Sequence, residues 1–168
     1  MTLDSKEEKY MSFLEEDYFL VFRGLPLPRS SGSEQLIRFY NQYTEHSLAA
    51  MPLMASELTI ALGFAGMLNF FRKNELSKVH VKRGCEFFLR LGIDSQHDAC
   101  ERIMRLSDGD GYVYLPSASG VYLALKRAAI HIALKNSVEK KDIIRFFGVT
   151  SRHLREVSKN HVYTKRDG

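Results

Sequence analysis

Two long segments of the chain are apolar on almost every side of a helix, and they constrain the fold more than any other feature. They cover about residues 52–73 and 117–134. Apolar residues recur in both at intervals of three and four, which is the period of an α-helix. A helix that is apolar all round must be buried, so each segment predicts a helix at the centre of a helical domain.

The rest of the chain also favours helices. Val, Ile and Thr rarely alternate with polar residues, and no Asn-Gly or Asp-Gly turn separates two strand-like runs. The pattern predicts an all-α fold class, with seven to eight helices in the domain. The remaining helices are expected at about residues 5–22, 33–47, 79–91, 95–106, 139–147 and 151–160, with a linker at 24–32.

The two apolar helices partly match each other. A shift of 63 residues aligns four pairs of identical residues: Ser56, Ala61, Leu62 and Ala65 fall on Ser119, Ala124, Leu125 and Ala128. Two apolar helices can agree this well by chance, so an internal repeat and an accidental match both stay open.

Length and composition exclude several classes of protein. The 168 residues suit one domain or two very small ones. Two cysteines cannot form a disulfide framework, and the N-terminus has no basic segment leading into an apolar one. We therefore expect an intracellular protein with reduced thiols, in the nucleus if the cell is eukaryotic and otherwise in the cytoplasm.

The most apolar stretch, residues 58–71, is too short to span a bilayer and predicts a core helix without membrane contact. A membrane-associated helical bundle that exposes this stretch is a further alternative.

Charge is distributed unevenly along the chain. Residues 1–77 hold 7 Lys/Arg and 10 Asp/Glu, a balance of −3, whereas residues 78–168 hold 17 and 10, a balance of +7. A basic second half suggests contact with an anion such as nucleic acid, although solvated helix faces give the same balance. We expect an acidic helical part at 1–77, a basic part at 78–160 and a flexible tail at 161–168.

The strongest local signal is a glycine between two short amphipathic helices. Ile143 and Phe147 precede Gly148, and Leu154 and Val157 follow it, which is the spacing of a helix-turn-helix. Ile144 departs from the pattern, because a small residue usually stands there. The predicted DNA-binding residues are polar or basic side chains of the two helices and the turn: Lys140, Lys141, Arg145, Thr150, Ser151, Arg152, Arg155 and Lys159.

Three stretches of the second half have recognisable motifs. Residues 86–93 contain Leu91-Gly92-Ile93 at the end of a helix, residues 128–133 contain Ile130-His131-Ile132-Ala133 in an Ala-rich central helix, and residues 141–155 contain Gly148-Val149-Thr150 between the last two helices. Together they resemble the cyclin-type repeat of transcription factor IIB and its relatives. The resemblance runs from Cys85 to Lys159, under half of the chain. It implies a cyclin-like core, contacts with promoter duplex DNA, and a TATA-binding protein or RNA polymerase as partner.

This chain also departs from that family. It has no zinc ribbon, its spacing from Ala133 to Asp142 is short, and a first repeat is recognisable only if residues 34–93 are a degenerate copy. Ser151-Arg152-His153-Leu154 is also similar to bacterial winged-helix regulators, without their wing or effector domain.

Enzyme signatures are missing from the sequence. The six histidines lack a metal-ligand spacing, and no Gly-rich phosphate loop or nucleophile elbow is present. We therefore expect no catalytic residues, no metal and no cofactor. The sequence predicts a non-enzymatic, transcription-factor-like DNA-binding module. A cyclin-type interaction domain that binds a partner helix or peptide is the alternative.

Overall fold

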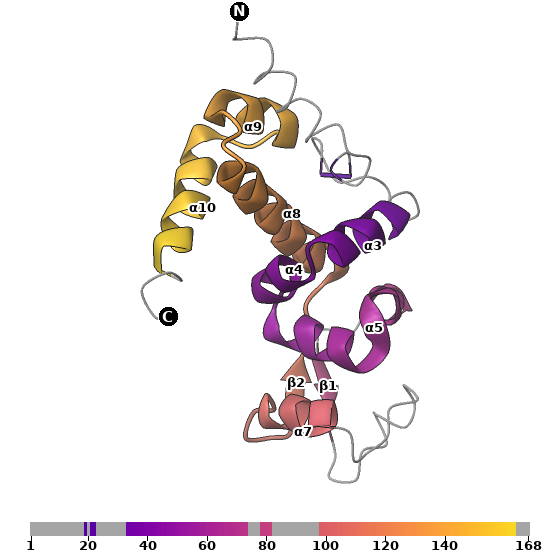
Figure 1. Ribbon diagram of the computed structural model, residues 1–168. Helices are drawn as coiled ribbons and strands as arrows, with labels where there is room; N and C mark the ends of the chain where they lie inside the picture. Colours follow the sequence, from indigo (N-terminus) through magenta and orange to yellow (C-terminus); the bar gives the residue numbers. More distant parts are fainter. Residues whose placement is uncertain (1–18, 20, 23–32, 74–77, 82–97, 164–168) are drawn as a thin grey trace, which may run out of the picture. The chain divides into compact units, whose positions relative to one another are not determined.

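The computed structural model describes residues 19, 21–22, 33–73, 78–81 and 98–163, with the elements labelled in Figure 1. These residues form seven helices and one two-stranded sheet, so the all-α prediction is confirmed. The elements are α3 (Ser33–Gln42), α4 (Thr44–Ala50), α5 (Leu53–Lys73), β1 (Lys78–His80), α7 (Asp98–Arg105), β2 (Tyr112–Tyr114), α8 (Ala118–Lys135), α9 (Lys140–Phe147) and α10 (Ser151–Tyr163).

Several predicted features lie outside the described residues. They are most of the helix at 5–22, the linker at 24–32, most of the helix at 79–91, and the end of the tail beyond residue 163. Leu91-Gly92-Ile93, the first stretch that resembles transcription factor IIB, lies there too. Residues 161–163 of the predicted tail belong to α10.

Contacts between residues divide the chain into two compact units. Unit 1 comprises Met1–Ser47 and Leu125–Gly168, and unit 2 comprises Leu48–Ala124. These units are defined by contacts between residues. The predicted boundary between residues 77 and 78 was based on charge, which the contacts do not test, so it stays a prediction.

Unit 1 has an aromatic cluster beside α3. The Phe39 side chain is fully buried, and its ring packs edge-on against Phe19 at 5.7 Å and Phe22 at 4.9 Å between ring centroids. The helix predicted over residues 33–47 is interrupted at Tyr43, where α3 ends and α4 begins. Thr44 donates a hydrogen bond of 2.9 Å from Oγ1 to the Tyr40 carbonyl at this junction.

Unit 2 is organised by α5, which is bent in its middle. Gly63 has φ 77° and ψ 163°, a region of backbone conformation that is essentially restricted to glycine. The buried Glu57 of α5 accepts a hydrogen bond of 2.7 Å at Oε2 from Nε of Arg102 on α7. This hydrogen bond raises the pKa of the Arg102 guanidinium. The ion pair therefore fixes α7 against α5.

The bend also bears on the membrane alternative. By length and composition alone, Leu53–Phe71 could cross a membrane, and half of that window is buried. Gly63 divides the helix into two straight parts of about 15 Å each, at 1.5 Å per residue. Each part alone is shorter than a hydrocarbon core of about 30 Å, and the choice between a core helix and membrane contact stays a prediction.

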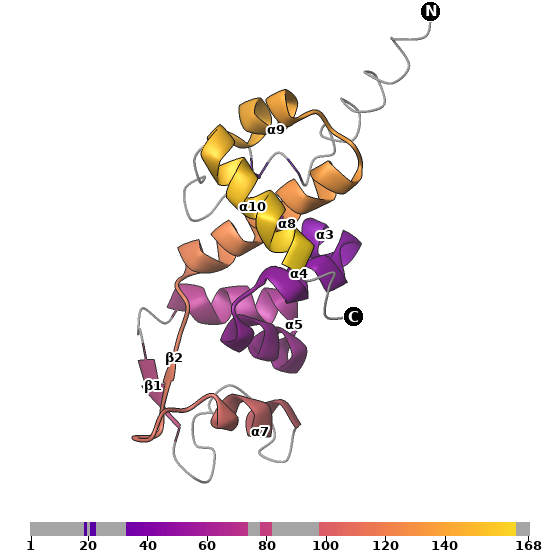
Figure 2. The same cartoon turned by 90° about the vertical axis from the view of Figure 1, so that its left-hand side faces the viewer.

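The two-stranded sheet differs from the sequence prediction. β1 and β2 pair antiparallel, with Val79 opposite Val113, and they lie side by side in Figures 1 and 2. The prediction of a helix beginning at Val79 is therefore wrong at residues 79–80. The strands are 34 positions apart along the chain, so no local hairpin signal marks them. The turn before β2 is stabilised by Asp108, whose Oδ1 accepts hydrogen bonds from the amides of Asp110 and Tyr112.

Candidate nucleic-acid interface

The end of α8 turns the chain sharply into α9. The amide of Val138 donates to the Ala133 carbonyl at 3.1 Å, and the amide of Ser137 donates to the Leu134 carbonyl at 3.1 Å. This pair of bonds is a Schellman motif, with Ser137 at the position that glycine usually holds. Ser137 accordingly has a positive φ of 61°.

Helix α9 begins and ends at well-defined positions. The Glu139 carbonyl accepts from the amides of Asp142 and Ile143, both at 3.0 Å. Gly148 ends the helix in the left-handed conformation, with φ 62° and ψ 34°. The predicted pair of helices around Gly148 is therefore confirmed, and the structure extends the second helix to Tyr163. We call Lys140–Tyr163 the helix-turn-helix segment.

Thr150 caps the second helix of this segment. Its Oγ1 accepts a hydrogen bond of 3.1 Å from the amide of His153, and its carbonyl accepts from the amide of Leu154 at 3.0 Å. Thr150 is therefore the N-cap, and Ser151 is the first residue of α10.

Four apolar side chains form the buried side of the helix-turn-helix segment. Ile143 and Phe147 are fully buried on α9, and Leu154 and Val157 are almost fully buried on α10. Figures 1 and 2 both show α10 next to α9. Ile144 is half-buried, so its bulk is accommodated partly at the surface.

The opposite side of the segment is polar and exposed. All eight predicted residues are exposed: Lys140, Lys141, Arg145, Thr150, Ser151, Arg152, Arg155 and Lys159. On α10, positions 151, 152, 155 and 159 recur at helical spacing, so these four side chains share one face. The structure thus places the predicted α10 residues on one face, which runs from Ser151 at the helix N-terminus to Lys159 in the third turn.

Acidic neighbours neutralise part of this positive charge. Arg152 Nε lies 3.2 Å from Glu156 Oε1, and Arg145 Nη2 lies 2.8 Å from Asp142 Oδ1. Lys141 Nζ lies 3.0 Å from Glu139 Oε2. All three cations keep well over half of their side-chain surface exposed, so the pairs can exchange for another anion at little cost.

The prediction omitted Glu156, which shares the exposed face of α10 with the basic residues. Its position four residues after Arg152 is a spacing at which opposite charges pair on a helix. That spacing could have revealed the pair in the sequence. A carboxylate on this face opposes binding of phosphate.

No group of three or more metal-ligating side chains gathers within the described parts of the chain. Comparison of the sequence with family models and with curated proteins yields no match, and the structure matches no solved structure.

Proposed function

We propose that the chain is a transcription-factor-like module that binds duplex DNA through its helix-turn-helix segment. The observation that supports this is the exposed face of α10, where Ser151, Arg152, Arg155 and Lys159 lie together. The buried apolar side of the segment leaves this face directed outward.

The geometry suits a DNA groove in two respects. An α-helix fits the major groove, and its N-terminal residues reach base edges there. Ser151 and Arg152 occupy that first turn of α10. The long, exposed side chains of Lys140 and Arg145 on α9 suit contact with backbone phosphates.

The resemblance to transcription factor IIB supports the same function. Gly148-Val149-Thr150, the turn that carries this resemblance, forms the left-handed turn and the cap of α10. A cyclin-like core, and a TATA-binding protein or RNA polymerase as partner, remain part of the proposal. The absence of an enzyme activity and an intracellular location belong to it as well.

Mutation of the α10 arginines tests the proposal. We expect Arg152→Ala/Arg155→Ala to weaken binding of a mixed-sequence duplex by at least about tenfold, measured by fluorescence anisotropy at low salt. The matched control is Arg105→Ala/Arg127→Ala, which removes the same charge from exposed positions outside the segment. Equal loss in both double variants would mean that only net charge matters.

Glu156 offers a test in the opposite direction. Glu156→Gln keeps the size of the side chain, removes a negative charge from the exposed face and releases Arg152 from its ion pair. We expect this variant to bind the duplex several-fold more tightly, because the local potential becomes more positive. Unchanged or weaker binding argues against this face as the DNA contact.

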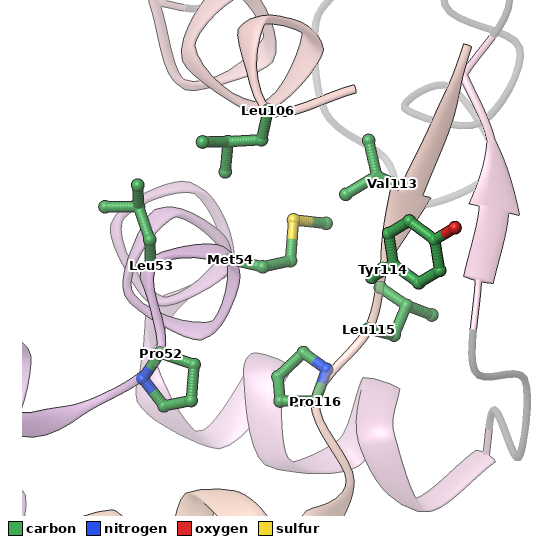
Figure 3. A pocket seen from close by; sticks show the side chains of 8 residues that line it. All are labelled: Pro52, Leu53, Met54, Leu106, Val113, Tyr114, Leu115 and Pro116. Carbon is green, nitrogen blue, oxygen red and sulfur yellow. The ribbon is translucent and has the colours of Figure 1, made fainter. Parts of the chain in front are cut away.

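A groove in unit 2 favours the second candidate, a cyclin-type interaction domain. The groove is open, has a volume of about 360 Å³ and has a mostly apolar lining, shown in Figure 3. Its lining residues come from α5, β2 and the segments next to them: Pro52, Leu53, Met54, Leu106, Val113, Tyr114, Leu115 and Pro116. A partner helix could insert apolar side chains here.

Purified TATA-binding protein is the probe that the family resemblance supplies for this candidate. If it occupies the groove, Leu53→Asp should weaken its binding in calorimetry. Leu53 is 61% exposed, so the substitution leaves the core intact. Leu123→Asp, at 52% exposure elsewhere in unit 2, is the control. Absence of binding to the wild type removes this partner.

A further inference from the structure

The small sheet of unit 2 has two chemically different faces. Val79 and Val113 lie opposite each other on one face, and Val113 is buried. Side chains alternate between the faces of a strand, so the flanking residues point the other way. That second face pairs Lys78 with Tyr114 and His80 with Tyr112, and it combines basic with aromatic side chains. We call these four residues the ribbon face.

One tyrosine of the ribbon face holds the two basic side chains in place. Lys78 Nζ lies 4.5 Å from the centroid of the Tyr112 ring, in a cation–π contact. The His80 ring packs edge-on against the same ring, with centroids 4.9 Å apart. His80 Nε2 also lies 3.1 Å from the Asp110 carbonyl oxygen. Tyr112 therefore positions the cation and the imidazole, and its own ring is occupied.

The other tyrosine is open to solvent. Tyr114 is 63% exposed, the highest value among the exposed large apolar side chains of the described residues. In Figure 3 its hydroxyl points away from Leu53 and Met54. Lys78 lies opposite Tyr114 in the strand register, so the exposed Tyr114 ring and the Lys78 side chain, whose ammonium group lies over Tyr112, share one face of the sheet.

Lys78 gives the ribbon face a positive charge, which favours an anionic ligand. In sequence, residues 78–83 read Lys-Val-His-Val-Lys-Arg, of which residues 78–81 are described by the structure. The acidic residues nearest in sequence to the two strands are Glu75, before β1, and Asp108 and Asp110, in the turn before β2. Asp108 Oδ1 accepts two backbone hydrogen bonds of 3.0 and 2.9 Å within that turn, so part of this negative charge is already engaged.

We propose that the ribbon face binds single-stranded nucleic acid, with one base stacked on Tyr114 and an adjacent phosphate against Lys78. Exposed aromatic rings beside cations are the usual platform for unpaired bases, because every base offers a π-face. In a duplex the bases are stacked on one another and unavailable to a tyrosine. The ribbon face shares no residue with the helix-turn-helix segment. Binding of a single strand there can therefore be tested independently of duplex binding.

A tryptophan in place of Tyr114 tests the proposal directly. The chain contains no tryptophan, so Tyr114→Trp creates a single emitter at the stacking position. Titration with oligo-dT and oligo-U of about 15 nucleotides should quench its fluorescence saturably. Leu123 is 52% exposed and also lies in unit 2, so Leu123→Trp is the control, and its fluorescence should not be quenched. Comparison of the two oligonucleotides distinguishes DNA from RNA as the source of the bases.

Affinity measurements separate this site from the duplex site. Tyr114→Ala should weaken binding of the single strand by about tenfold or more, because one base no longer has a ring to stack on. Tyr114→Phe keeps the aromatic face and should bind as the wild type does, which also controls for folding. Neither variant should change duplex affinity, and Arg152→Ala/Arg155→Ala should leave the quenching intact.

Two results would overturn the proposal. One is an unquenched Tyr114→Trp at saturating oligonucleotide. The other is stronger quenching by a duplex than by the single strand, which would make the ribbon face part of a duplex interface.

Discussion

Gly148 in unit 1 and Gly63 in unit 2 both have positive φ, yet they bend the chain in different ways. Gly148 has φ 62° and ψ 34°, the left-handed conformation that normally ends a helix. Gly63 has φ 77° and ψ 163° and lies within a run of apolar residues. The first position is readable from the sequence because amphipathic helices flank it. The second was predicted as part of a continuous helix.

The surfaces of the two units differ as well. The exposed large apolar side chains of the described residues all belong to unit 2: Leu53, Ile60, Tyr114 and Leu123. The large apolar side chains described in unit 1 are instead buried or half-buried, and the exposed side chains on α9 and α10 include basic ones. The contrast matches the two proposals, which assign duplex DNA to unit 1 and a stacking or apolar ligand to unit 2.

The largest expected effect concerns the core of the helix-turn-helix segment. Phe147 is fully buried, so Phe147→Ala should lower the free energy of unfolding by about 3–5 kcal/mol through reduced burial and a cavity. Phe146 is only half-buried and serves as the control. Phe146→Ala should cost much less in the same denaturant titration. Equal costs would show that α9 is oriented differently.

The bend of α5 gives the next effect. Gly63→Ala should lower the free energy of unfolding by about 1–3 kcal/mol, because alanine is strained at this φ and ψ. A Cβ there meets no atom within 4 Å, so the loss would come from backbone strain alone. Gly109→Ala also meets no atom and needs no positive φ. If both variants are equally stable, α5 is a continuous helix.

The cap of α10 gives a smaller effect. Thr150→Ala should lower the free energy of unfolding by about 1 kcal/mol, because the amide of His153 loses its acceptor. Thr150→Ser keeps the hydroxyl and should retain most of the stability. Thermal unfolding followed by circular dichroism measures both. A fully stable Thr150→Ala would assign the cap to another residue.

The smallest effect has the opposite sign. Ser137 has φ 61° at the end of α8, a conformation that glycine adopts without strain. Ser137→Gly should therefore raise the free energy of unfolding by about 0.5 kcal/mol. Ser117→Gly, at an exposed position outside a helix, is a contrasting control, because Ser117 Oγ accepts from the amide of Gly120. That variant should lose stability.

The sequence predicted the parts of the fold that local chemistry determines. The apolar period of α8 and the glycine between α9 and α10 each act within a few residues, so their helices were correctly located. The eight predicted interface residues are all exposed, as expected from the amphipathic pattern.

Other features depend on partners distant along the chain. The pairing of Val79 with Val113 and the ion pair of Glu57 with Arg102 join segments that are 34 and 45 positions apart. No periodicity in a single window can reveal such pairings. The bend at Gly63 was missed for a related reason, since a glycine inside an apolar run does not by itself show which φ the packing selects.

The salt dependence of duplex binding tests the central claim most directly. Each phosphate that the protein neutralises contributes about 0.9 to the slope of log affinity against log salt concentration. We predict that the slope of Arg152→Ala/Arg155→Ala is shallower than that of the wild type by about 0.9 for each of the two arginines that contacts a phosphate. The slope of Arg105→Ala/Arg127→Ala should be unchanged. Identical slopes for the wild type and both double variants would contradict DNA binding by the exposed face of α10.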